Sequence, residues 1–225
     1  HVWHAFTQMA EYEPLLIDRA EGCTLYDTAG RAYLDGVSSL WCNVHGHREP
    51  RIDAAIRAQL DKVAHVTSLG LGNPTTALLA KRLTELAPPG LEHVFFSSDG
   101  SSAVEVALKM ALQYQRQRAE PKPKKTLYVA LLPLPTTYRL PEGVTSETAC
   151  EFYLNQLREL LERDYERIAA LVIEPLVQCA AGMITHPVGY LRGVRELTMA
   201  YDVLLICDEV AVGLGRTGTM FACEH

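Results

Sequence analysis

The sequence of 225 residues has no long apolar run, no excess of basic residues and no closely spaced cysteines. Its apolar stretches are of strand length, far below the roughly 20 residues that cross a bilayer, which excludes a membrane-spanning helix within these residues. With 21 Lys and Arg against 27 Asp and Glu, it lacks the basic surface of a dedicated nucleic-acid binder. The six cysteines form no C-x-x-C pair and no signal peptide precedes them, so we expect a reduced, cytoplasmic compartment.

The composition is that of a globular protein with a sizeable core, since hydrophobic residues make up 48% and charged residues 21% of the chain. Short apolar runs alternate with segments of helical periodicity, which is typical of an α/β fold with a mostly parallel sheet flanked by helices. Before residue 50 the pattern is that of a hairpin, with strands at 23–26 and 31–35. We therefore predict a small N-terminal lobe at 1–50 and part of a large α/β domain at 51–225.

Apolar side chains at helical spacing predict five helices, and short apolar runs predict four strands. The helices are expected at about 50–66, from Asn73-Pro74 to the Pro88-Pro89-Gly90 stop, and around 104–112, 157–165 and 191–197. The strands are expected at 94–97, 126–131, 169–174 and 203–207. The strand at 126–131 runs into a proline-rich stretch with no crossover helix, so either this connection is an irregular loop or a segment is missing where Leu131 meets Leu132.

The first candidate site lies where a strand gives way to a helix, at Ser97-Ser98-Asp99-Gly100-Ser101-Ser102. Ser102 and Glu105 have the spacing of a capping box, which predicts that the helix opens at Ser102. Backbone N–H groups at a helix start, together with the positive end of the helix dipole, bind anions and above all phosphate. The alternative is a capped helix without a ligand, because no lysine of a nucleotide-binding loop follows.

The second candidate site is the acidic pair Asp208-Glu209, which follows the apolar strand at 203–207. It lies at the carboxyl end of that strand, where open α/β sheets bind ligands, and Glu174 follows another strand in the same way. Because neighbouring side chains of a strand point to opposite faces, only one carboxylate of the pair can enter a site. Three roles are open to it: to hold a protonated heteroaromatic nitrogen, to bind magnesium, or to cap the next turn.

Three further patterns are weaker. Gly213–Gly218 matches G-x-G-x-x-G, but the acidic pair precedes it, so a glycine-rich turn is favoured over the fingerprint of a nicotinamide-dependent dehydrogenase. His45-Gly46-His47 has no further ligand at a suitable spacing, so we predict a turn and no metal site. Aromatic residues near glycine-rich turns, Trp3, Phe6 and Trp41, either contact a ligand or pack in the core.

In their order along the chain, these segments resemble the class III, fold-type I pyridoxal-phosphate aminotransferases. The segments that carry the resemblance are His1–Met9, Leu34–Trp41, Val44–His47, Gly100–Met110, Ile173–Gln178 and Asp208–His225. The resemblance covers nearly all of the chain and is strongest for the members of the family that act in biotin synthesis. It implies transamination of 8-amino-7-oxononanoate to 7,8-diaminononanoate, with adenosylmethionine as the amino donor.

The resemblance also implies roles for individual residues. Gly100 and Ser101 would lie at the phosphate of pyridoxal 5'-phosphate, and Asp208 would pair with the pyridine nitrogen and keep it protonated. The residues expected to face the substrate are Phe6, Leu40 and Trp41. The partners implied are the two small-molecule substrates and a second copy of the chain in a homodimer, with no nucleic acid and no membrane.

The sequence departs from the family in three ways. The Schiff-base lysine of the family lies beyond the final Glu-His segment, and no lysine of this chain follows Asp208. The Tyr-His-Gly-Asp-Thr segment of the family is absent at Leu131–Leu132. We therefore expect an incomplete enzyme that does not transaminate by itself and is poorly soluble. Leu40 and Phe6 replace aromatic and phenolic side chains, which keeps open another class III aminotransferase, one for ω-amino acids or diamines. The missing lysine keeps open a second alternative, a non-catalytic truncated homologue.

Overall fold

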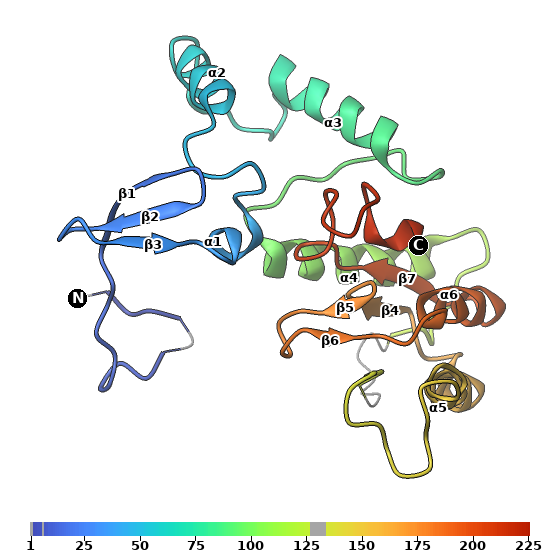
Figure 1. Cartoon of the computed structure of the whole chain (residues 1–225). Helices are drawn as coiled ribbons and strands as arrows, with labels where there is room; N and C mark the ends of the chain where they lie inside the picture. The colour runs from blue at the N-terminus through green and yellow to red at the C-terminus, as the bar shows by residue number, and fades with distance from the viewer. Residues whose placement is uncertain (1, 6, 127–133) are drawn as a thin grey trace. The chain divides into compact units, whose positions relative to one another are not determined.

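The computed structural model describes residues 2–5, 7–126 and 134–225. The chain divides into two compact units, His1–Asn73 and Pro74–His225 (Figure 1). The lobe predicted at 1–50 lies within the first unit, and its assignment as a separate domain stays a prediction. Phe6 and most of the strand predicted at 126–131 lie outside the described residues. Among the helices that are described, none is long and apolar enough to cross a membrane.

The first unit contains an antiparallel sheet of three strands, in the order β1 (Ile17–Glu21), β2 (Thr24–Asp27) and β3 (Ala32–Leu34). The hairpin of β2 and β3 confirms the prediction from the sequence. Its turn is fixed by Asp27, whose Oδ1 accepts hydrogen bonds from the N–H groups of Ala29 and Arg31. Gly30 has a φ of 79°, a conformation that glycine adopts without strain. Strand β1 was not predicted, because its largely exposed side chains show no alternation of apolar and polar residues.

Two short helical segments complete this unit, α1 (Ser38–Trp41) and α2 (Pro50–Leu60). Pro50 begins α2, as its fixed φ and missing N–H group allow, and the carboxylate of Glu49 caps it. The prediction that this helix continues to about residue 66 was wrong. The helix ends at Leu60, and the N–H of Lys62 binds the carbonyl of Gln59 three residues earlier, which is the tightened last turn common at helix ends.

The second unit is built around a parallel pair of strands, β4 (Ala170–Ile173) and β7 (Leu204–Cys207). One face of this pair packs against α5 (Ala149–Asp164) and α6 (Tyr190–Ala200), which also pack against each other (Figure 1). The buried core between these elements contains Ala149, Tyr153, Leu154, Leu157, Leu161, Ile168, Tyr190, Val194 and Val203. The predicted parallel arrangement and both helices are confirmed.

Two more helices belong to this unit, α3 (Pro74–Leu86) and α4 (Gly100–Gln117). Both agree with the predicted positions. On α4, the fully buried Gln115 donates from Nε2 to the carbonyl of Ala169, just before β4. The neighbouring Lys125 is buried as well, and its Nζ donates to the carbonyls of Tyr165 and Ile168 at 2.9 and 3.1 Å. Burial lowers the pKa of Lys125 below its usual value.

The remaining elements are a short antiparallel pair, β5 (Val177–Gln178) and β6 (Ile184–Thr185), and a 3-10 turn, η1 (Ala222–Glu224). The prediction of a strand at 94–97 was wrong. Its residues are apolar enough for a strand, but a strand also needs a partner for its backbone N–H and C=O groups, and no described segment pairs with it. The side chains of Phe95 and Phe96 are exposed.

Candidate active site

The first turn of α4 is organised by Asp99, which is the N-cap of the helix. Its Oδ1 accepts from the backbone N–H of Ser102 and its Oδ2 from the hydroxyl of Ser102, both at 2.8 Å. These bonds lower the pKa of Asp99 below its usual range. The prediction that the helix opens at Ser102 was therefore wrong, because Asp99 caps a helix that begins at Gly100, and Ser102 already lies in its first turn as the donor to that cap.

Gly100 allows this turn to approach the segment that follows β7. A Cβ added to Gly100 would lie 3.2 Å from Cγ2 of Val210, a separation that forces one of the two residues to move. The close approach brings the start of α4 next to the residues that follow the strand. The two candidate sites of the sequence analysis are thus neighbours in space.

Asp208 extends the β4–β7 ladder by one residue, since its N–H donates to the carbonyl of Ile173 at 2.8 Å. Its Oδ1 accepts from the N–H of Val210 at 3.1 Å. The backbone and the carboxylate of Asp208 are therefore both held at the carboxyl end of the strand, which is the edge that the sequence predicted as the ligand-binding edge.

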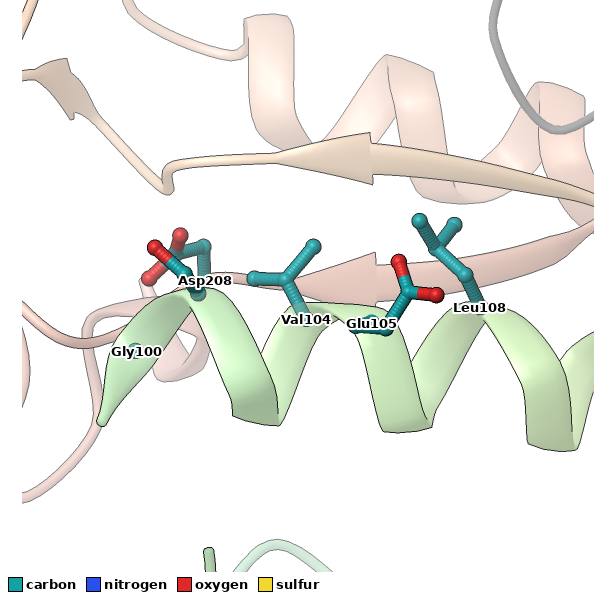
Figure 2. Close-up of a pocket in the computed structure, with 6 residues that line it drawn as sticks. Gly100, Val104, Glu105, Leu108 and Asp208 are labelled. Atoms are coloured by element: carbon teal, nitrogen blue, oxygen red, sulfur yellow. The ribbon is translucent and has the colours of Figure 1, made fainter. Parts of the chain in front are cut away.

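One cavity of about 360 Å³ is lined by residues of both candidate sites (Figure 2). Its lining residues are Gly100, Ser101, Val104, Glu105, Leu108 and Asp208. In Figure 2, Asp208 lies beside the first turn of α4, and Val104, Glu105 and Leu108 follow along the helix. The cavity therefore offers the positive end of a helix dipole, two carboxylates and an apolar wall formed by Val104 and Leu108. The carboxylate of Glu105 is paired with Lys109 at 3.1 Å, whereas that of Asp208 lies at the helix start. This combination suits a ligand with an anionic group at one end and a basic nitrogen elsewhere.

The second acid of the pair, Glu209, has a structural role. Its two carboxylate oxygens accept from the N–H groups of Ala222 and Cys223, each at 2.8 Å. Gly213 fits against the same residue, because an added Cβ would lie 2.8 Å from the Glu209 carbonyl. Burial and the neighbouring Glu209 raise the pKa of Cys223 to about 12, so this thiol stays protonated.

The glycine-rich stretch Gly213–Gly218 forms successive turns and does not open a helix. Gly215 and Gly218 have φ values of 88° and 104°, which explains two of its glycines. The predicted turn is thus confirmed, and this geometry does not match a dinucleotide fingerprint. Glu174 also has a local partner, since its Oε2 accepts from the N–H of Cys179 at 2.9 Å.

The two described substrate candidates, Leu40 and Trp41, lie in the first unit, within α1. All four residues of α1 have positive φ values, between 46° and 73°, so the segment is a left-handed turn. Such a conformation costs about 1–2 kcal/mol per residue for residues other than glycine. Leu40 is exposed and Trp41 is half-buried.

A polar cluster that the sequence analysis missed holds this turn. Asp35 accepts from the N–H of Ser39 at 2.9 Å and from its hydroxyl at 2.8 Å, and the ring of His47 lies 2.8 Å from the same carboxylate. Hydrogen bonds, first from the Ser39 N–H and then from His47, lower the pKa of Asp35 to about 2. Residues 44–47 form the predicted turn, and the described part of the chain contains no group of three or more metal-binding side chains.

Comparison with known proteins identifies the family of this chain. The model of the class III aminotransferases matches residues 7–132 and 125–225. The chain belongs to the class III aminotransferase family. Class III aminotransferases depend on pyridoxal phosphate, and the two matched stretches meet at the junction where the sequence indicated a missing segment.

The curated and solved relatives agree with this family. The adenosylmethionine-8-amino-7-oxononanoate aminotransferase of Nitratidesulfovibrio vulgaris is 47% identical over an alignment of 261 residues, which covers all of this chain and 48% of the relative. The crystal structure of the enzyme of that name from Methanocaldococcus jannaschii matches with a TM-score of 0.86 and 36% identity, over 100% of this chain and 56% of that one. A pyridoxal-phosphate-bound amine transaminase from an uncultivated Pseudomonas species matches with a TM-score of 0.86 and 33% identity, over 98% and 58%.

These likenesses confirm the predicted fold, that of the fold-type I pyridoxal-phosphate transferases. The chain spans about half the length of the curated relatives it matches. The relative from N. vulgaris also aligns over more residues than the 225 of this chain, as expected if class III relatives carry extra residues within the matched region.

Proposed function

We propose that the protein carrying this chain is a pyridoxal-phosphate-dependent aminotransferase of biotin synthesis, which passes the amino group of adenosylmethionine to the ketone of 8-amino-7-oxononanoate. Membership of the class III family supports this proposal, as do the names of the relatives from N. vulgaris and M. jannaschii. The observation that carries it is the cavity in which the first turn of α4 meets Asp208.

The charges that line this cavity are complementary to those of the cofactor. Pyridoxal phosphate has a phosphate group on one side of its ring and a basic ring nitrogen in the ring itself. The first turn of an 18-residue helix attracts the phosphate, so Gly100 and Ser101 would hold it. The carboxylate of Asp208 would hold the ring nitrogen. When bound, the cofactor supplies the electron sink for the electrons released as a substrate proton is removed.

The residues of the site would bind and orient the cofactor and the substrates. Asp208 keeps a proton on the ring nitrogen because its own charge stabilises the positive charge there, and the N–H of Val210 fixes one of its oxygens. Val104 and Leu108 would form an apolar wall beside the bound cofactor. Phe6, Leu40 and Trp41 would contact the substrates. The Schiff-base lysine would come from residues beyond His225, so these 225 residues alone would not transaminate.

The proposal includes a homodimer and a cytoplasmic location. All six cysteines are free in the structure, which agrees with a reducing compartment. A second candidate function is an amine or ω-amino-acid transaminase. It is favoured by Leu40, an exposed side chain where the resemblance expects an aromatic one, and by the likeness to the Pseudomonas amine transaminase.

The test uses the protein purified from its natural source, with pyridoxal phosphate added. We expect an absorbance band at the edge of the visible range that borohydride abolishes, and amino transfer from adenosylmethionine to 8-amino-7-oxononanoate. Transfer from simple amines or ω-amino acids, with none from adenosylmethionine, would favour the second candidate. A protein without the band and without either activity would contradict both.

A further inference from the structure

The left-handed turn Ser38–Trp41 requires a restraint. Single residues in this conformation are uncommon outside glycine, and four in succession are disfavoured unless their surroundings hold them. Part of the restraint is local, since the N–H of Trp41 donates to Val37 and that of Asn43 donates to Ser38. Neither bond involves Ser39, whose N–H and hydroxyl bind the side chain of Asp35 instead.

Those contacts start from two residues that the sheet holds in place. The N–H of Asp35 donates to the carbonyl of Cys23 at 2.9 Å, and His47 exchanges two backbone hydrogen bonds with Gly22, at 2.7 and 3.0 Å. Gly46 permits this pairing, because an added Cβ would lie 2.9 Å from the Gly22 carbonyl. Asp35 and His47 are therefore both anchored to the connection between β1 and β2.

From this anchor, the side chains converge on Ser39. One oxygen of Asp35 accepts from the Ser39 N–H and the other from its hydroxyl. Nδ1 of His47 lies 3.3 Å from Nδ2 of Asn43 and accepts from it, which leaves the ring hydrogen on Nε2, facing Asp35. The side chains of Asp35 and His47 are only 4% and 15% exposed, so water competes little for these bonds.

We propose that Asp35, Ser39 and His47 are positioning residues that hold Leu40 and Trp41 in one conformation and thereby determine how tightly the amino acceptor binds. This inference rests on the proposed function, which assigns Leu40 and Trp41 to the substrate. The three residues touch neither substrate nor cofactor in this account. They act through the backbone of the turn.

The first test reads the turn without any activity. Trp3 and Trp41 are the two tryptophans of the chain, so Trp3→Phe leaves Trp41 as the reporter within these residues. In the natural full-length protein with its other tryptophans also replaced, Asp35→Asn and the milder Ser39→Ala should shift the emission of Trp41. Asp53→Asn is the matched control, because Asp53 pairs with Arg48 in the same unit without touching the turn.

The second test measures the kinetics of the same variants. We expect Asp35→Asn and Ser39→Ala to raise the KM for 8-amino-7-oxononanoate, by roughly tenfold for the stronger variant, while kcat changes much less. Asp53→Asn should match the parent protein. His47→Gln, which can still donate to Asp35, should behave more mildly than His47→Ala.

The outcomes separate the two proposals. Unchanged Trp41 emission in Asp35→Asn and Ser39→Ala would overturn the positioning role, whatever the activity. A shifted emission with an unchanged KM would overturn the role in acceptor binding. A parent protein without aminotransferase activity would overturn the proposed function and the acceptor role with it, and the emission of Trp41 would still decide whether the three residues hold the turn.

Discussion

Gly100 lies against Val210 so closely that a Cβ added to the glycine would stand 3.2 Å from Cγ2 of the valine. Gly100 begins α4, and Val210 follows Asp208 by two residues. This contact joins the helix start that would bind phosphate to the carboxylate that would bind a ring nitrogen. The distance between the two ends of the cofactor site therefore depends on a residue without a side chain.

Replacing Gly100 by alanine should weaken the binding of pyridoxal phosphate. The new methyl group pushes Val210 and the neighbouring Asp208 away from α4, and we expect roughly a tenfold loss of affinity, as small displacements in binding sites often cause. A spectroscopic titration with the cofactor measures it. The double variant Gly100→Ala with Val210→Ala should recover most of the affinity, and a failure to recover would contradict the steric explanation.

Asp208→Asn should slow transamination far more than it weakens substrate binding. Asparagine cannot stabilise a positive charge on the ring nitrogen, so the electron sink weakens where charge develops, and a loss on the order of 10²-fold or more in kcat is expected. Single-turnover kinetics measure this effect. Asp202→Asn serves as the control, since Asp202 pairs with Arg118 at the surface of the same unit. Equal rates in Asp208→Asn and the parent would exclude the assigned role.

Asp99 should hinder the binding of phosphate. Its carboxylate caps the helix start at which the phosphate would bind, so like charges meet when the cofactor enters. Asp99→Ser and Asp99→Asn keep a capping side chain but remove the charge, and both should tighten cofactor binding by about threefold to tenfold. Equilibrium dialysis at constant ionic strength measures the affinity. Weaker binding in both variants would show instead that the carboxylate helps to build the site.

The stability of the first unit should depend on pH through Asp35. Its pKa is lowered to about 2 in the folded chain, against a usual value of 3.8, because the folded chain donates hydrogen bonds to the charged form. The stabilisation is therefore complete above about pH 4 and is lost as the pH falls toward 2. Denaturant unfolding of the parent and of Asp35→Asn, followed by the emission of Trp41, should give a difference that shrinks over this range. A constant difference would contradict the assignment.

Lys125→Met should destabilise the second unit by about 1–3 kcal/mol, the usual cost of leaving buried acceptors without a donor. Nζ of Lys125 donates to two carbonyls in the segment that follows α5, and methionine has a similar length but no donor. Lys124→Met is the matched control, because Lys124 is exposed and pairs only loosely with Glu166, at 3.6 Å. Similar unfolding free energies for the two variants would show that the buried bonds contribute little.

Several features of the fold follow from local sequence. The Asp27–Gly30 turn and the stop after α3 depend on residues next to each other, and the structure has them where expected. The prediction of a strand at 94–97 was wrong because a strand needs a partner from a distant segment of the chain. The local pattern of apolar residues carries no information about that partner. The prediction of the N-cap of α4 was wrong for another reason. Asp99 and Ser102 both have side-chain oxygen atoms that can cap a helix, and their spacing alone does not select one.

In the candidate site, too, single residues could be predicted from the sequence but their spatial neighbours could not. Asp208 and Gly100 could be proposed separately, because each follows an apolar run and matches a family motif. Their meeting in one cavity depends on the register of β4 and β7 and on the packing of α4, which no spacing reveals. Asp35 and His47 were missed as partners since they lie 12 residues apart and meet through the sheet that anchors them.

The most direct test of this account is a crystal structure of the natural full-length protein with pyridoxal phosphate bound. We predict the phosphate at the N–H groups of Gly100 and Ser101, and the ring nitrogen within hydrogen-bonding distance of the Asp208 carboxylate. A cofactor bound elsewhere, or bound in this cavity with its ring nitrogen directed away from Asp208, would contradict the account.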